Sequence, residues 1–210
     1  MPAPSKFNSP NDEETLRLSV RSWRLGLTPP MWLTLAAILA VHVTALRLEG
    51  HRWWCKCGQP SLWVSDTRSM HNSQHLLDPY SFSHVSHGIL VFGLCTWLLP
   101  SLAFGWRLVV ATAIEVVWEI VENTQFVIDR YRAATISLDY YGDSVGNSFG
   151  DVLSCLVGFL LARYLGLWRS IVLLVVLELL LLFWIRDNLL LNVVMLIHPI
   201  DAVKAWQSAQ

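Results

Sequence analysis

Three glutamates occupy one apolar stretch of the chain at helical spacing. Glu115, Glu119 and Glu122 stand at i, i+4 and i+7, so a helix would align their carboxylates along one stripe. A charge at the centre of a bilayer costs at least about 2.5 kcal/mol on insertion scales, and such residues usually face a bundle interior, pair with another group or mark a site. We therefore take Glu119 and Glu122 as candidate catalytic residues; a structural pairing with arginine is the alternative.

A second polar stripe starts the next apolar segment. Asp143, Asn147 and Asp151 repeat at i, i+4 and i+8, again on one helical face. Asp143 could simply cap the helix. Capping cannot explain Asp151, which lies two turns inside, so the stripe predicts catalytic aspartates with Asn147 as a substrate contact.

Four of the seven histidines lie between residues 71 and 87. Neutral imidazole with carboxylate oxygens suits zinc, iron or manganese, and a histidine beside carboxylates can equally act as an acid or base. A hydrogen-bonded structural network is the third interpretation. The predicted catalytic set is His75, His84, His87, Glu119, Glu122, Asp143 and Asp151, and the predicted ligands of a divalent metal are His84, His87, Glu122 and Asp143.

Two arginines follow the glutamate stripe. Arg130 and Arg132 lie in a segment that also contains several acids. Because arginine forks bind carboxylate or phosphate in a bidentate manner, these residues either balance the neighbouring acids or hold an anionic headgroup. The second interpretation makes them substrate-binding residues.

A Cys-x-Cys pair, Cys55 and Cys57, lies among tryptophans before the histidine-rich segment. Cysteines this close seldom bridge each other without strain. They could bind a metal, pair with another chain or remain free thiols. The tryptophans are typical of anchors at a membrane interface, and that interpretation is favoured for the segment as a whole.

Composition points to the bilayer as the solvent. Hydrophobic residues make up 54% of the 210 residues, mean hydropathy is +0.44, and only 15% are charged, with a net charge of −1. This chain is too apolar for an ordinary soluble protein. It also lacks the basic surface that nucleic-acid binding requires.

The apolar stretches predict an all-α, polytopic membrane helix bundle of about five transmembrane helices with a polar outer-surface loop. A cytoplasmic segment, 1–30, precedes one membrane-embedded domain, 31–206. The expected spans are 31–48, 84–106, 108–128, 144–166 and 171–190. Arg17, Arg21 and Arg24 ahead of the first span favour a cytoplasmic N-terminus, and the alternation of spans then gathers the acids and histidines at the outer surface.

The chain resembles an uncharacterised domain-of-unknown-function family of bacterial, mainly alphaproteobacterial, multi-pass inner-membrane proteins. The motifs that carry the resemblance include Trp54-Cys55-Lys56-Cys57-Gly58, Asn72-Ser73-Gln74-His75, Ile128-Asp129-Arg130-Tyr131-Arg132, Gly142-Asp143-Ser144 and Arg186-Asp187-Asn188-Leu189. The resemblance implies an inner-membrane location and supplies no activity. A second likeness, to VanZ-like membrane proteins, rests on polar histidine and aspartate positions at helix ends.

These residues favour a membrane-embedded hydrolase or transferase acting on a lipid-linked or phosphate-bearing substrate at the outer surface. A transporter or proton relay could use the same acids and histidines, and a membrane scaffold would need them only as structure. An enzyme predicts a pocket closed below Glu115, whereas a transporter predicts polar residues that continue to the opposite surface.

Overall fold

The computed structural model describes residues 25–134 and 140–209. Within these residues the fold is all-α, and the only β-pairing is an isolated bridge between Trp63 and Leu77. The helices are α2 (Pro29–Leu48), α3 (Ser81–Leu98), α4 (Phe104–Glu122), α5 (Gln125–Ala134), α6 (Val145–Trp184), α7 (Leu189–Ile197) and α8 (Asp201–Ser208). The N-terminal arginines used to predict the orientation lie outside the described residues, and so does Asp139, one of the acids in the segment that contains Arg130 and Arg132.

Two described helices, α2 and α6, are long and apolar enough to cross a membrane. This finding suggests a membrane protein, but it does not confirm a bundle of about five spans. The reason lies in the polar residues of the other two long helices. α3 begins with serines and histidines, and α4 carries Arg107 and the three glutamates, so both are less apolar than an ordinary span.

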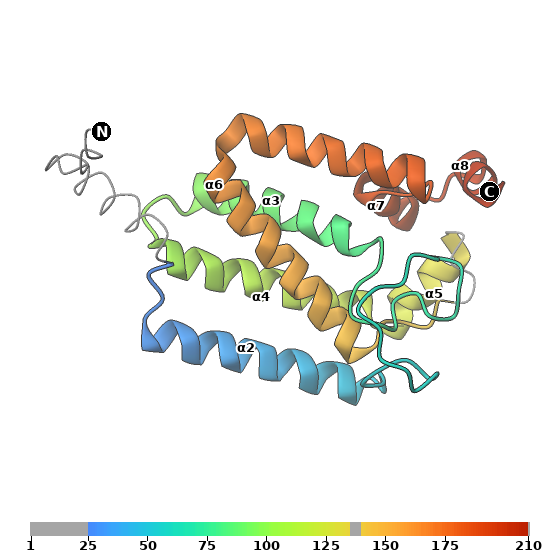
Figure 1. Ribbon diagram of the computed structural model, residues 1–210, viewed down its shortest axis with the longest axis horizontal. Coiled ribbons are helices and arrows are strands. Elements are labelled where there is room, and N and C mark those ends of the chain that lie inside the picture. The colour runs from blue at the N-terminus through green and yellow to red at the C-terminus, as the bar shows by residue number, and fades with distance from the viewer. Residues whose placement is uncertain (1–24, 135–139, 210) are drawn as a thin grey trace, which may run out of the picture.

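Helix α6 is two arms joined at Gly166. This glycine has φ 73° and ψ 175°, a conformation that a side chain would strain. The chain turns back there, so that the second arm runs towards the end of the molecule at which the first arm began (Figure 1). The two arms correspond to the fourth and fifth predicted spans. The second arm ends at Trp184, before the predicted boundary at residue 190. α7 begins as a separate helix at Leu189.

The second and third predicted segments are shifted and shortened. α3 ends at Leu98, where Pro100 prevents the helix from continuing. α4 stops at Glu122 and α5 starts at Gln125, because the Asn123 side chain bonds both the Glu119 carbonyl and Asp143. The break between α4 and α5 therefore places Asn123 beside Asp143.

Helix α3 packs mainly on α6, and α2 packs on α4. Two glycines allow the first contact. A Cβ at Gly88 would lie 1.9 Å from the Cys155 carbonyl oxygen, and one at Gly158 would lie 2.0 Å from that of Val85. The backbones of α3 and α6 are therefore closer than any side chain would permit, as in the small-residue contacts of membrane helices.

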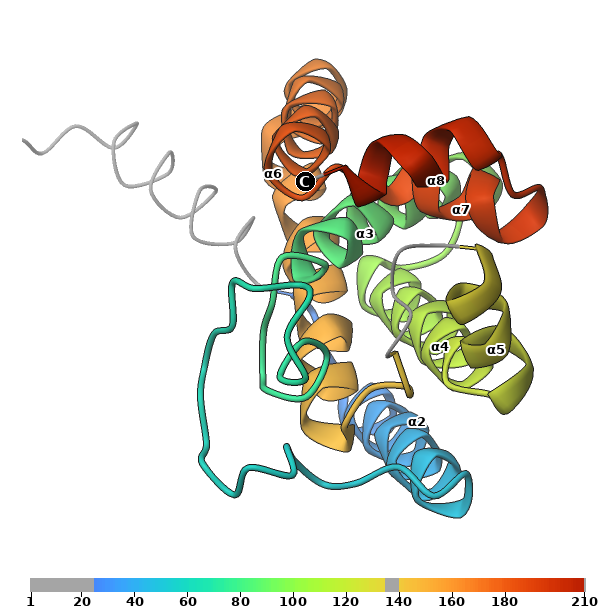
Figure 2. The ribbon, with the colours of Figure 1, turned by 90° about the vertical axis from the view of Figure 1, so that its right-hand side faces the viewer.

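The two ends of the bundle differ in polarity. Cys95, Leu108, Ala111 and Phe159 form an apolar core at one end. At the other end, α5, α7, α8 and the long segment 49–80 gather around the start of α3 and the start of α6 (Figures 1 and 2). The expected collection of polar residues on one side of the bundle is what the fold produces.

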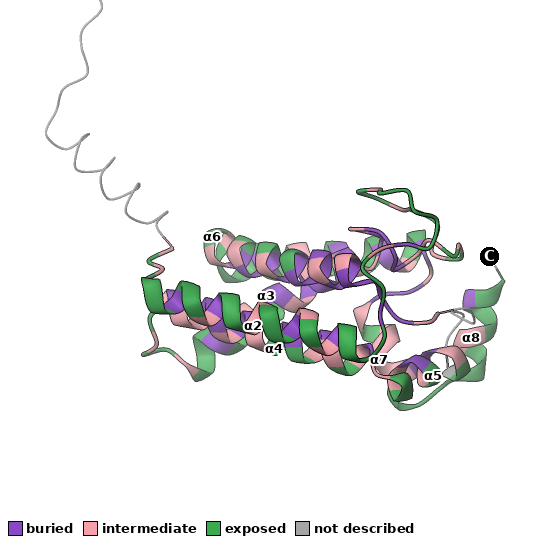
Figure 3. Cartoon of the chain, turned by 90° about the horizontal axis from the view of Figure 1, so that it is seen from below, coloured by how far each residue is buried: buried purple, intermediate pink, exposed green. Residues whose placement is uncertain are grey.

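Exposed residues run along the outer faces of the helices (Figure 3), and many of them are large and apolar. Trp97 is 76% exposed, Phe183 81% and Trp168 77%. Exposed apolar surface on this scale marks an interaction with a membrane or with other proteins.

The close packing of α3 on α6 predicts a clear difference between two glycine variants. Gly158→Ala should lower the melting temperature, because the added methyl must push the helices apart at a cost of about 1–3 kcal/mol. Gly93→Ala, on the same helix pair but with nothing within 4 Å of the added atom, should melt at or slightly above the wild-type temperature. Thermal unfolding followed by circular dichroism in detergent measures both, and equal melting of the two variants would refute the packing argument.

Candidate functional site

His84 is the centre of the polar end. Its ring lies on the first turn of α3, with Nδ1 2.6 Å from Glu115 Oε1 and 3.2 Å from Glu119 Oε1. On its other side, Nε2 lies 4.0 Å from Asp151 Oδ2. All four side chains are buried. One imidazole is therefore enclosed by three carboxylates from α4 and α6.

His87, one turn further along α3, approaches the same glutamate. Its Nδ1 lies 3.2 Å from Glu115 Oε1 and 3.3 Å from Oε2. The ring packs edge-on against those of His84 and Trp118. Glu115 therefore contacts both histidines, which are three residues apart on α3 and share one face of it.

A hydrogen-bonded chain leads from this centre towards α2. Ser148 donates to Glu119 Oε2 at 2.6 Å, and Ser148 Oγ lies 2.7 Å from His42 Nε2. Sequence reasoning missed both residues. His42 could have been found, because an ionisable residue inside an apolar span is itself a signal of a polar interior; Ser148 carries no such signal.

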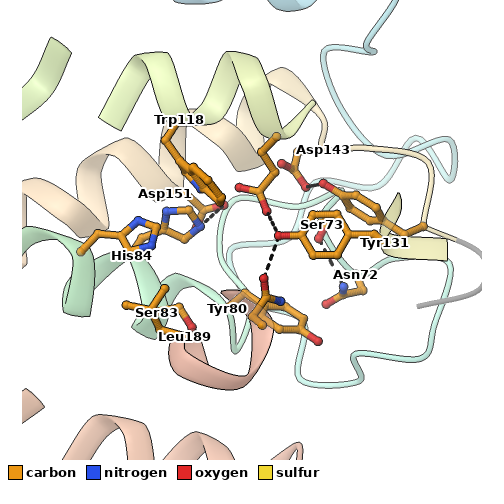
Figure 4. Close-up of a pocket in the computed structure, with 14 residues that line it drawn as sticks. Asn72, Ser73, Tyr80, Ser83, His84, Trp118, Tyr131, Asp143, Asp151 and Leu189 are labelled. Atoms are coloured by element: carbon orange, nitrogen blue, oxygen red, sulfur yellow. Dashed lines mark hydrogen bonds and ion pairs between the residues drawn. The ribbon is translucent and has the colours of Figure 1, made fainter. Parts of the chain in front are cut away.

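A cavity of about 60 Å³ opens beside His84 (Figure 4). It has room for an ion with a few waters or for the reacting group of a larger molecule. Its lining consists of Asn72, Ser73, Tyr80, Ser83, His84, His87, Trp118, Glu122, Tyr131, Tyr140, Asp143, Asp151, Leu189 and Asn192. Of the seven predicted catalytic residues, five line this cavity and Glu119 lies directly behind His84.

Tyrosines hold the two acids on the far wall. Tyr131 donates to Glu122 Oε1 at 2.7 Å, and Tyr140 donates to Asp143 Oδ1 at 3.0 Å. Asp143 also accepts from the Asn123 amide at 2.8 Å. It does not cap α6, because Ser144 occupies that position and accepts from the Asn147 backbone. Asp143 is therefore free to face the cavity.

Asn147 and Asp78 lie behind the cavity wall. Asp78 accepts from the backbone N–H groups of Ser73 and Tyr80 and from the Asn147 amide. Burial, together with the charge of Asp143, raises the pKa of Asp78 to about 6. These bonds fold the segment 73–80 against α6, so the predicted substrate contact Asn147 supports the lining without belonging to it.

The predicted substrate-binding arginines donate hydrogen bonds to backbone carbonyls around the site. Arg130 donates to the carbonyls of Leu196 and Ile197 at the end of α7, and Arg132 donates to the Tyr140 carbonyl. Among the residues that the structure describes, no lysine or arginine lines the cavity. A phosphate group would therefore need another positive partner in this site.

The geometry brings together two groups of potential metal ligands here. His84, Glu119 and Glu122 form one, and His84, His87 and Glu115 form the other, each with its ligand atoms within 4.8 Å of one another. Three of the four predicted metal residues, His84, His87 and Glu122, are in these groups. Asp143 is in neither, since Asn123 and Tyr140 hold it on the opposite wall. His75 lies apart from the cavity, with its Nε2 3.8 Å from Cys57 Sγ.

Within the described residues, fold and site define an all-helical protein with two helices long and apolar enough to cross a membrane, and with a buried histidine–carboxylate cavity at one end. The chain belongs to the family described as "Protein of unknown function (DUF2585)", whose model matches residues 46–209. This result confirms the resemblance drawn from the sequence motifs.

Relatives named UPF0314 protein occur in several alphaproteobacteria. The Paracoccus denitrificans protein is 49% identical over 86% of this chain and 93% of its own length. The Rhizobium meliloti protein is 50% identical over 85% and 91%, and the Brucella anthropi protein 45% identical over 90% and 94%. No solved structure matches the chain.

A buried aspartate beside the cavity predicts a pH-dependent stability. Asp187 accepts from the Asn188 backbone and from Tyr80, and burial raises its pKa to about 6. The folded state therefore binds a proton more tightly than the unfolded chain does. This contribution to stability is complete below about pH 4 and is lost as the pH rises through 6, a change of roughly 2–3 kcal/mol.

Asp187→Asn should make the decline of the melting temperature between pH 4 and pH 7 shallower than in the wild type. The exposed Asp201→Asn is the matched control and should leave the slope unchanged. Melting curves across this range decide the question, and parallel profiles for the wild type and Asp187→Asn would contradict the assignment.

Proposed function

We propose that this chain is a multi-pass inner-membrane hydrolase or transferase whose cavity at the outer surface acts on a lipid-linked or phosphate-bearing substrate. The observation that carries the proposal is the enclosure of His84 by Glu115, Glu119 and Asp151 beside a small cavity. Such an arrangement supplies acids, bases and metal ligands in one place.

The charge balance of the site favours a divalent cation. Glu115, Glu119 and Asp151 are buried, and buried charges are normally paired or coordinate a metal. The basic groups nearest to them are the two imidazoles. His84, Glu119 and Glu122 would hold the ion, a nitrogen and oxygen set that suits zinc, iron or manganese. The ion would also supply the positive partner that a phosphate oxygen requires.

The reaction would then use the remaining lining residues. A water in the cavity loses a proton to Asp151 and attacks the phosphorus, the bond from phosphorus to the leaving oxygen breaks, and His87 protonates that oxygen. An acceptor hydroxyl in place of water makes the same chemistry a transfer. Both residues line the cavity, and both lie next to His84.

The size and surroundings of the cavity favour an amphiphilic substrate. About 60 Å³ accommodates only the reacting group, so the rest of the molecule must lie outside. Trp118 and Leu189 place apolar surface beside the acids. The exposed apolar faces of the helices would continue that surface into the bilayer.

The hydrogen-bonded chain of polar residues that starts at His84 ends inside the bundle, which favours an enzyme over a transporter. From His84 the hydrogen-bonded residues reach Ser148 and His42, whose Nδ1 is buried with no hydrogen-bond partner. The described side chains beyond this point form apolar clusters around Leu35, Leu108 and Phe159. A proton or solute route would need polar groups through that layer.

Manganese binding tests the metal site. The purified full chain in lipid nanodiscs should remove about one equivalent of Mn²⁺ from the free-ion electron paramagnetic resonance signal. Glu122→Gln should weaken binding at least 10- to 100-fold, since it removes one ligand of the ion, while Asp201→Asn should bind like the wild type. Wild-type protein that binds no manganese, zinc or iron would refute the metal-dependent mechanism.

Phosphate release tests the chemistry. With a prenyl pyrophosphate as the probe, the wild type should release inorganic phosphate, and Asp151→Asn should reduce the rate by about 100-fold or more, as expected for loss of a general base. Equal rates for the two proteins would place the chemistry elsewhere. A metal-loaded protein inactive on phosphoesters would overturn the substrate class and leave the metal site intact.

Alkaline phosphatase fusions test the topology. A fusion after Gly58, in the segment between α2 and α3, should be active because the proposal places that segment outside the cytoplasm. A fusion after Ser101, in the turn between α3 and α4, should be inactive. The reverse pattern would put the cavity at the cytoplasmic surface.

A further inference from the structure

A second cluster of metal-ligating side chains lies in the segment 49–80, apart from the cavity. Cys55, Cys57, His71 and His75 place one ligand atom each within 4.8 Å of all the others. Cys55 Sγ lies 3.3 Å from His71 Nδ1, Cys57 Sγ lies 3.8 Å from His75 Nε2, and the two nitrogens are 3.4 Å apart. We call these four residues the Cys–His cluster.

These distances match the edges of a zinc tetrahedron. With Zn–S bonds of about 2.3 Å and Zn–N bonds of about 2.05 Å at tetrahedral angles, sulfur and nitrogen ligands are about 3.6 Å apart and two nitrogens about 3.3 Å apart. The Cys–His cluster agrees within about 0.3 Å on all three edges given above. The remaining pairs of ligand atoms also lie within 4.8 Å of one another, so all four atoms are close enough together to be ligands of one ion.

Hydrogen bonds within the cluster explain the closeness of the four ligand atoms less well than a bound metal ion does. His71 Nδ1 is approached both by Cys55 Sγ and by His75 Nε2, although a ring nitrogen either donates one proton or accepts at one lone pair. An ion at the centre takes a lone pair from all four atoms at once.

The backbone around the cysteines is arranged for thiolates. The Cys57 N–H points to Cys55 Sγ at 3.5 Å, and the Gln59 N–H points to Cys57 Sγ at 3.4 Å. Donors of this kind stabilise a negative sulfur, which is the form that binds metals.

We propose that Cys55, Cys57, His71 and His75 bind a structural zinc ion. Two thiolates and two imidazoles in a tetrahedral arrangement favour zinc among the common divalent metals. Two thiolates also neutralise its charge, and no position remains open for a substrate. The assignment gives His75 a role different from the catalytic one predicted from the sequence.

The ion would fix a segment that shapes the cavity. Residues 49–80 contain no helix, and structureless connections this long are uncommon unless they are functional. The zinc would tie the Cys55 turn to His71 and His75, on either side of the cavity-lining residues Asn72 and Ser73. Closing that loop removes conformational freedom from the unfolded chain.

Zinc analysis of the full chain in detergent, after passage over a chelating resin, tests the proposal. The wild type should retain about one equivalent of zinc, and Cys57→Ala and His71→Ala should each lose it. Cys95→Ala and His198→Ala are the matched controls, since Cys95 lies in the apolar core and His198 is exposed at the end of α7. Both should retain the zinc.

Cobalt substitution keeps the test decisive if the cysteine variants fail to fold. Cobalt-loaded wild type should show thiolate-to-cobalt charge-transfer and tetrahedral d–d bands. Absence of those bands, four free thiols in zinc-free folded protein, or a Cys55–Cys57 disulfide in the mass spectrum would each overturn the proposal. Zinc that is lost in Glu122→Gln but retained in Cys57→Ala would assign the ion to the cavity instead. The two ligand sets share no residue, so either site can fail without the other.

Discussion

The contact of His84 with Glu115, Glu119 and Asp151 sets the arrangement of the three helices that carry these residues. A buried carboxylate without a partner costs several kcal/mol, so α3, α4 and α6 must meet at the height and rotation that bring these groups together. The same contact explains why α3 and α4 are less apolar than α2 and α6. Their polar residues are directed inwards, and their outer faces remain apolar.

Close packing makes this contact possible. Gly88 and Gly158 allow the backbones of α3 and α6 to touch, and that approach places Ser81 of α3 against Asp151 of α6 at 2.8 Å. The turn at Gly166 returns the second arm of α6 to the polar end (Figure 1). A bundle with wider spacing would leave the carboxylates in separate layers.

The segment 49–80 links the proposed catalytic cavity to the proposed zinc ion. Asp78 and the Cys–His cluster fold two parts of this segment, and Asn72, Ser73 and Tyr80 reach the cavity from it. The fold therefore combines a helical bundle with a polar cap, which is formed by the segment 49–80 and the short helices α5, α7 and α8. In the proposed function, the chemistry would take place where the bundle and the cap meet, at the ends of helices, where a substrate from the bilayer could reach the cavity.

The sequence by itself determined the all-α class, the approximate helices and the collection of acids and histidines at one end. These follow from local periodicity, because spacings of three, four and seven fix which side chains share a helical face. Only the tertiary structure decided which faces meet. His42 and Ser148 are hydrogen-bonded to the site, and Asp143 lies on the cavity wall opposite His84. Arg130 and Arg132 donate to backbone carbonyls outside the cavity. Cys55 and Cys57 lie beside His71 and His75 although 13 or more residues separate them in the sequence. Helix rotation and loop path depend on packing between segments distant in sequence, and no local pattern encodes them.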